Sequence, residues 1–158
     1  MTFLPFLLVG QGAQMSLVGL ALGLTFAGGA VGKFVCGLLA ERLGIIRTVI
    51  LTEAATGVGI FFLLILPLQA AIPLLPILGL VLNGTSSVLY GTVAEFVVPE
   101  RRSRAYGLFY TIGIGSGAIA PPAFGVLSDW AGISTTLGIL SGVVMITIPL
   151  AVLLRKSI

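Results

Sequence analysis

The polar side chains able to do chemistry are concentrated in one otherwise apolar stretch of the chain. Four of them recur at spacings of three and four residues, which places them on one face of a helix: Asn83, Ser86, Ser87 and Tyr90. In hydrocarbon, such a stripe needs hydrogen-bond partners or a water-filled cavity. We therefore predict that it forms the wall of a substrate cavity, to which Tyr110 adds from a later segment. Hydrogen bonding between packed helices is the alternative.

One further candidate is Glu53, an acidic residue about 9 Å beyond Arg47 at ~1.5 Å per helical residue. A lone carboxyl inside a membrane span is a candidate for proton coupling. Pairing with a nearby arginine and snorkelling to the interface are the alternatives. The chain has no histidine and a single cysteine, Cys36, so it cannot hold a Ser-His-Asp or Cys-His catalytic set. We expect no enzyme activity and no metal or other cofactor.

The elements that position these side chains must be membrane-spanning helices. Of the 158 residues, 58% are hydrophobic and 8% are charged, whereas soluble domains have about 25% charged residues. So few charges cannot cover a soluble surface. Five segments have the ~20 residues needed to cross a bilayer, and residues 1–10 form a shorter apolar run. We predict a single all-α transmembrane domain with helices at 16–39, 47–66, 73–97, 103–127 and 134–154, and a partial helix at 1–10.

The lysine and arginine residues fall in or beside alternate loops. They occupy positions 33, 42 and 47, then 101, 102 and 104, then 155 and 156, whereas loops 11–14, 68–71 and 128–133 contain none. With five spans, alternate loops share one side, which the positive-inside rule makes cytoplasmic. We expect a multi-pass protein of the cell (inner) membrane with a cytoplasmic C-terminus. The basic residues then set the topology in the lipid bilayer, and no nucleic-acid partner is expected.

Two loops carry the same pattern, G-x-L-small-acid-x-x-G, at 37–44 and at 125–132, which are 88 residues apart. Three spans separate the copies, so the two loops face opposite sides of the membrane. This arrangement predicts an inverted-topology repeat of three helices, which is common in secondary transporters.

The first copy resembles the loop signature of the major facilitator superfamily. The matching positions are Gly37, Leu39, Glu41, Arg42, Gly44 and Arg47. The resemblance implies that residues 1–10 are the end of helix seven and that helices eight to twelve follow, so that the chain is the C-terminal half of a transporter. The alternative is that it holds helices one to six. Residues 83–91 resemble drug-efflux members related to the fosmidomycin-resistance group.

The resemblance implies transport of a small solute, such as a drug, by alternating access, together with the missing other half. In its cytoplasmic gate, Glu41 would lie against the N-terminus of helix 103–127, with Ser103 as N-cap and Gly37 allowing close approach. Arg42 and Arg47 would pair with Glu95 and Glu100 to complete the gate, whose further members are Gly44 and Arg104. The alternative is that these charges only set topology. A small autonomous membrane protein that acts as an assembly or regulatory partner is the alternative function, and we expect the isolated half not to transport.

Overall fold

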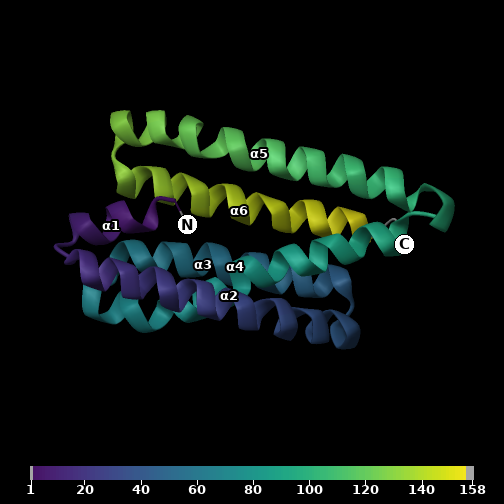
Figure 1. Cartoon of the computed structure of the whole chain (residues 1–158), viewed down its shortest axis with the longest axis horizontal. Coiled ribbons are helices and arrows are strands. Elements are labelled where there is room, and N and C mark those ends of the chain that lie inside the picture. The colour runs from purple at the N-terminus through teal and green to yellow at the C-terminus, as the bar shows by residue number, and fades with distance from the viewer. Residues whose placement is uncertain (1, 156–158) are drawn as a thin grey trace.

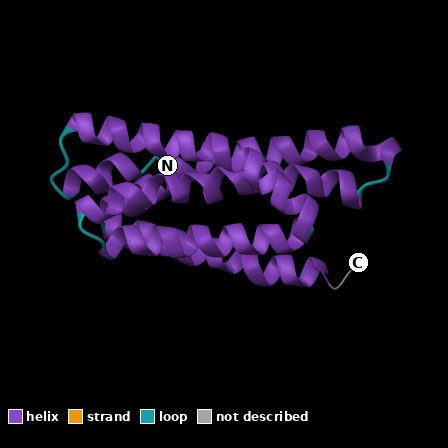
Figure 2. Cartoon of the chain, turned by 90° about the horizontal axis from the view of Figure 1, so that it is seen from below, coloured by secondary structure: helices purple, strands orange, loops and turns teal. Residues whose placement is uncertain are grey.

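The computed structural model describes residues 2–155, and all of the described regular structure is helical (Figures 1 and 2). Lys156, expected at the C-terminal end, lies outside the described residues. The elements follow in the order α1 (Leu4–Gly10), α2 (Met15–Leu43), α3 (Ile45–Ile65), α4 (Leu68–Phe96), the 3-10 turn η1 (Pro99–Arg101), α5 (Arg102–Ala131) and α6 (Ile133–Arg155).

Helices α2 to α6 are long and apolar enough to cross a membrane. Helix α1 has seven residues and is too short to span. The predicted class, an all-α membrane protein with five spans after a partial helix, is therefore confirmed.

Two local expectations are wrong. Residues 68–71, predicted as a loop, form the first turn of α4, because the extended Pro67 starts the helix there and Pro73 lies within it. Ser103 is not the N-cap of α5. That helix begins one residue earlier, with Arg101 at the cap position and no side chain bonding to its first N–H groups.

The 88-residue repeat is visible in the backbone. Gly44 ends α2 with φ +86°, and Gly132 ends α5 with φ +82°, a region that a glycine adopts without steric cost. In each case the next helix begins at the following residue. Four residues further on, Thr48 and Thr136 are buried and each donates its hydroxyl to the glycine carbonyl at 3.0 Å. The two turns lie at opposite ends of the bundle, as an inverted repeat requires (Figure 1).

Helices α2 and α4 make the most extensive packing in the bundle. Gly28 and Gly32 on α2 lie against the backbone of Pro76 and Leu80 on α4, and Gly79 of α4 lies against the backbone of α2. There is no room for a Cβ at these glycines. Lipid gives helices no hydrophobic drive to associate, so close backbone approach of this kind holds them together.

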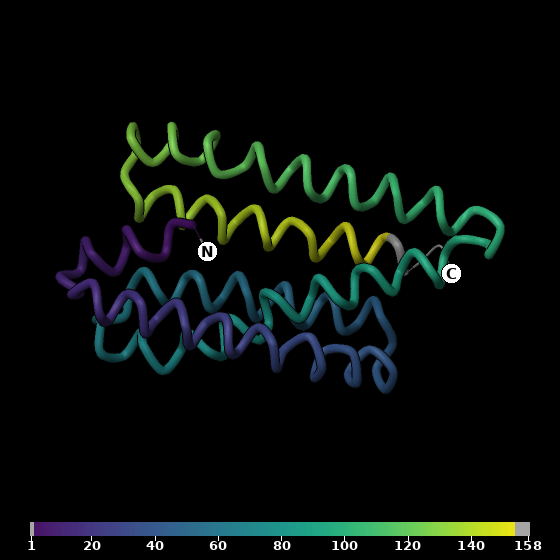
Figure 3. The backbone as a smooth tube through the Cα atoms, viewed as in Figure 1, coloured from purple at the N-terminus to yellow at the C-terminus, as the bar shows by residue number. Residues whose placement is uncertain are grey.

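Helix α5 stands apart from this core. It meets α6 and α4 only lightly, and its backbone runs at the edge of the bundle (Figure 3). None of its side chains is buried. Gly113 and Gly117, predicted to allow close helix packing, have no atom near enough to meet an added Cβ. Among the described residues, the first of the two G-x-x-x-G pairs packs against another helix and the second does not.

The α2–α3 turn and the α4–α5 connection lie at the same end of the bundle (Figure 1). These two connections and their flanking residues carry five arginines, at positions 42, 47, 101, 102 and 104, and we refer to this end as the basic end. The opposite end holds the α1–α2, α3–α4 and α5–α6 connections, whose residues include no lysine or arginine.

Candidate functional site

The predicted stripe on α4 lies on the face of that helix between α2 and α5. At one end, Asn83 packs against Gly29 of α2, where an added Cβ would meet the asparagine amide. At the other end, the ring of Tyr90 packs against rings of α5. The members of the stripe are half-buried, so this face is neither packed shut nor fully exposed.

Hydrogen bonds within α4 satisfy part of the stripe. The amide of Asn83 donates to the Gly79 carbonyl at 3.3 Å, and the Ser86 hydroxyl donates to the Asn83 carbonyl at 2.7 Å. Ser87 forms no hydrogen bond with the described residues. Asn83 and Ser86 therefore bond within α4, whereas the Tyr90 side chain hydrogen-bonds to Tyr110 of the neighbouring helix α5.

An aromatic cluster joins the stripe to α5. Tyr90 and Tyr110 stack with ring centroids 4.6 Å apart and an interplanar angle of 19°. Phe109 meets Tyr90 edge to face at 5.4 Å, and the Tyr106 hydroxyl donates to the Tyr90 carbonyl at 3.2 Å. The structure thus brings together Tyr90 and Tyr110, two residues that sequence reasoning had placed on separate segments.

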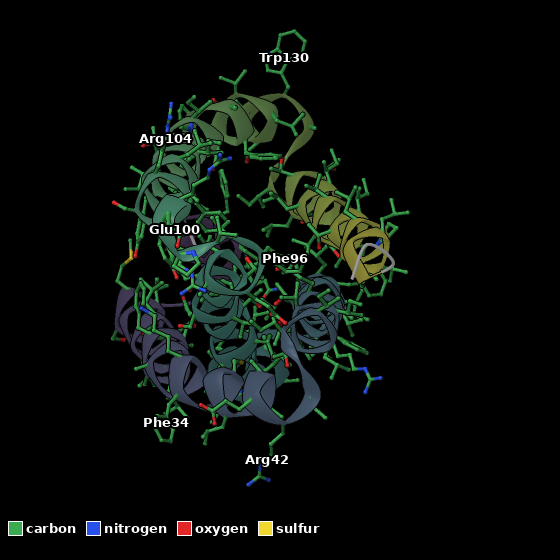
Figure 4. All side chains as sticks on the ribbon, turned by 90° about the vertical axis from the view of Figure 1, so that its right-hand side faces the viewer. Phe34, Arg42, Phe96, Glu100, Arg104 and Trp130 are labelled. Carbon is green, nitrogen blue, oxygen red and sulfur yellow. The ribbon has the colours of Figure 1, made fainter. Side chains whose placement is uncertain are left out.

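The signature residues lie at the basic end, on the surface. Glu41, Arg42 and Arg47 are exposed, and Arg42 points away from the bundle (Figure 4). Gly44 supplies the sharp α2–α3 turn described above. Gly37 has no atom near enough to meet an added Cβ, so the close approach expected of it is absent within this chain.

The expected charge pairs of the gate are not formed within the described residues. Glu95, Glu100 and Arg104 are exposed beside the α4–α5 connection, where Figure 4 labels Glu100 and Arg104. Among the described residues, Glu41 makes no ion pair or hydrogen bond to the start of α5. Each of these side chains is instead accessible at the basic end.

Sequence reasoning missed the role of Arg102. Its guanidinium donates from Nε to the Val97 carbonyl at 3.0 Å and from Nη2 to the Ala94 carbonyl at 2.7 Å. These carbonyls end α4, where the helix dipole is negative and backbone acceptors lack partners. A basic residue soon after a predicted helix end is the signal that could have indicated it. Arg102 fixes the α4–α5 connection, and with it the aromatic cluster.

Glu53 lies between α3 and α6 rather than beside an arginine. Its Oε2 lies 3.4 Å from the Thr147 hydroxyl oxygen, which also lies 2.6 Å from the Val144 carbonyl. One turn away, Ser141 donates to the Gly57 carbonyl at 2.8 Å. No ion pair to Glu53 is present in the described part of the chain. Because its partner is a hydroxyl, the expected arginine pairing is not observed.

Five spanning helices, an inverted repeat and a polar, aromatic face on a spanning helix define a multi-pass membrane protein built like a secondary transporter. The chain belongs to the Major Facilitator Superfamily, whose family model matches residues 1–157. It is therefore part of a transporter family and not an enzyme.

A gentisate transporter of Corynebacterium glutamicum is similar to this chain. The two are 29% identical over 148 residues, which cover 91% of this chain and 32% of that protein. The chain thus spans about a third of the length of that relative. No solved structure matches the chain.

Proposed function

We propose that the chain is the C-terminal half of a secondary active transporter that moves a small organic solute by alternating access. The α4 face between α2 and α5 forms its share of the solute pathway. The observation that carries this proposal is the stacked pair Tyr90–Tyr110, which continues the polar stripe of α4 across to α5. The inverted repeat supports rocking of one half against the other as the mechanism.

The chemistry of this face supports a solute with a planar ring. Tyr110 is 46% exposed, so one face of its ring remains accessible for stacking. Asn83 and Ser87 add polar atoms on the neighbouring α4 surface. A small aromatic acid fits this combination, and the similarity to a gentisate transporter supports that class. A ring-containing drug, carried outward in exchange for an ion, is the second candidate, supported by the resemblance of residues 83–91 to drug-efflux members.

The exposed charges at the basic end support a gate with partners outside this chain. Glu41 and Arg42 have no ion pair among the described residues and are accessible to the other half. With the basic end on the cytoplasmic side of the cell membrane, as the positive-inside rule expects, this gate would close the cytoplasmic face. The half-buried Glu53 remains the candidate for coupling to protons.

The test is uptake of labelled gentisate into proteoliposomes that hold the complete transporter containing this half. Tyr110→Ala removes the stacking ring and should raise the KM about two- to tenfold, the equivalent of ~0.5–1.5 kcal/mol for an aromatic pair. Tyr110→Phe keeps the ring and should restore the KM. Phe34→Ala is the matched control, because that ring is exposed and points away from the bundle (Figure 4).

Two results would contradict the proposal. Equal KM values for Tyr110→Ala and Phe34→Ala would remove Tyr110 from the pathway. Solute flux through liposomes that hold this chain alone would show that no second half is needed and would favour the autonomous alternative.

A further inference from the structure

An apolar cavity of about 360 Å³ lies between α3, α4, α5 and α6, next to the basic end. Its volume falls within the range of roughly 300–1,000 Å³ typical of ligand sites. It differs from the polar stripe, because none of the stripe's α4 residues lines it, although Phe109 contacts both the cavity and Tyr90. Six of the residues that line it show its character: Ile46, Val49, Val93, Phe96, Phe109 and Ala151.

The interior of this cavity offers almost nothing to a polar solute. Thr92 is its one lining residue with a polar side chain, and that hydroxyl already donates to the Leu89 carbonyl at 2.5 Å. Phe96 lies on the side of α4 that faces α6, and it closes part of the cavity with a hydrocarbon ring (Figure 4). The part of a ligand that enters here must therefore be apolar.

The rim of the cavity is cationic. Val97 lines the cavity, and the guanidinium of Arg102 is hydrogen-bonded to the carbonyl of that residue. A guanidinium has five N–H groups, and its bonds to Val97 and Ala94 use two of them. The other three have no partner among the described residues, and no carboxylate forms an ion pair with Arg102 there. Arg47 directly follows the lining residue Ile46 in α3 and is exposed at the same end, so its long side chain can bring a second positive charge to a headgroup bound there.

We propose that this cavity binds one acyl chain of an anionic phospholipid, whose phosphate is held by Arg102 and Arg47. The apolar interior of the cavity matches the acyl chain of such a lipid, and the guanidinium at its rim matches the phosphate. Basic groups between spanning helices at the cytoplasmic side are typical of anionic headgroup sites. The lipid would cover the cavity between the lightly packed α5 and the rest of the bundle.

A second apolar cavity, of about 190 Å³, provides an internal comparison. It lies toward the opposite end, where Phe3, Leu63 and Leu137 are among its lining residues. The connections at that end contain no lysine or arginine, so this cavity offers no charge to a headgroup. Of these two cavities, the one at the basic end combines an apolar interior with a cation at its rim.

The experiment measures which lipid stays bound to the full chain after it is taken from nanodiscs made of equal parts phosphatidylglycerol and phosphatidylcholine. Native mass spectrometry of the protein counts the retained lipid. Unsubstituted protein should retain phosphatidylglycerol in preference. Arg47→Gln should lower that retention about fivefold, because one basic group near a charged lipid contributes that factor. Ala151→Phe should lower retention of the same lipid by filling the cavity.

Arg42→Gln is the matched control, since it removes an equal charge at the same end from a side chain that points away from the bundle (Figure 4). It should leave retention unchanged. Arg102→Gln should also lower retention, but it disturbs the end of α4, so Arg47→Gln and Ala151→Phe decide the matter if that variant does not fold. Equal retention of the two lipids, an equal loss in Arg42→Gln and Arg47→Gln, or full retention in Ala151→Phe would each overturn the proposal.

Discussion

The packing of α2 on α4 makes a sharp prediction about two glycines of the same helix. Gly32 faces the backbone of Leu80, whereas Gly37, one and a half turns further on, faces open space. An alanine at position 32 places its Cβ against backbone atoms that have no flexible side chain to give way. An alanine at position 37 would have no described atom within 4 Å of its Cβ. We expect Gly32→Ala to separate α2 from α4 and Gly37→Ala to leave them packed.

The size of the effect follows from this difference. Forcing a methyl group into a packed interface costs about 1–3 kcal/mol. At an open helix position, alanine is favoured over glycine by ~0.5–1 kcal/mol. The two variants should therefore differ in stability by about 2 kcal/mol or more.

The chain contains its own probe of the interface. Cys36 is its single cysteine, is 0% exposed, and lies where Gly84 of α4 meets α2. Its rate of reaction with a maleimide in detergent micelles therefore reports how often α2 and α4 part. A loss of 1–3 kcal/mol corresponds to labelling about five- to 150-fold faster in Gly32→Ala. Gly37→Ala should label as slowly as the unsubstituted chain, and equal rates in the two variants would refute the packing argument.

Three further outcomes are expected. In the complete transporter, Glu41→Gln should lower transport without lowering membrane insertion, measured as uptake and as protein in the membrane fraction; unchanged uptake would exclude the gate. Arg102→Ala should lower the free energy of unfolding by about 1–3 kcal/mol in a denaturant titration, because two charge-assisted bonds to the end of α4 are lost; a value near zero would mean that the cap is not formed. Ser141→Ala should cost only ~0.6 kcal/mol in the same titration, as is typical of hydrogen bonds between membrane helices; a loss of several kcal/mol would contradict this.

The membrane class and the number of spans were predictable because each depends on residues close together in the sequence. The repeat was predictable because each of its two copies is a short local pattern. Length and hydropathy decide whether a segment can span. Each copy ends in a turn with a positive φ, which a glycine adopts most easily, so the glycines at positions 44 and 132 already indicated these turns. The stripe on α4 was predictable for the same reason, since helical spacing alone puts Asn83 and Tyr90 on one face.

The role of Arg102 was not predictable in the same way. The sequence places three arginines, at 101, 102 and 104, in one short connection, and any of them could reach the end of α4. Which one does so depends on where α5 begins, and that residue differed from the expected one because no side chain caps the helix. The direction of a single side chain at a turn follows from the exact backbone path.

The two G-x-x-x-G pairs show the limit of local patterns most clearly. Gly28 and Gly32 pack on α4, whereas Gly113 and Gly117 repeat the same spacing on α5 without a described neighbouring atom within 4 Å of an added Cβ. The spacing shows that a helix face allows close approach, but burial also needs a second helix at that face. By the repeat, α1 is the counterpart of α4, and its seven residues are too few to run along α5. The repeat therefore accounts for the exposed face of α5 in residues 2–155. The local sequence could not distinguish the G-x-x-x-G pair that packs from the pair that does not.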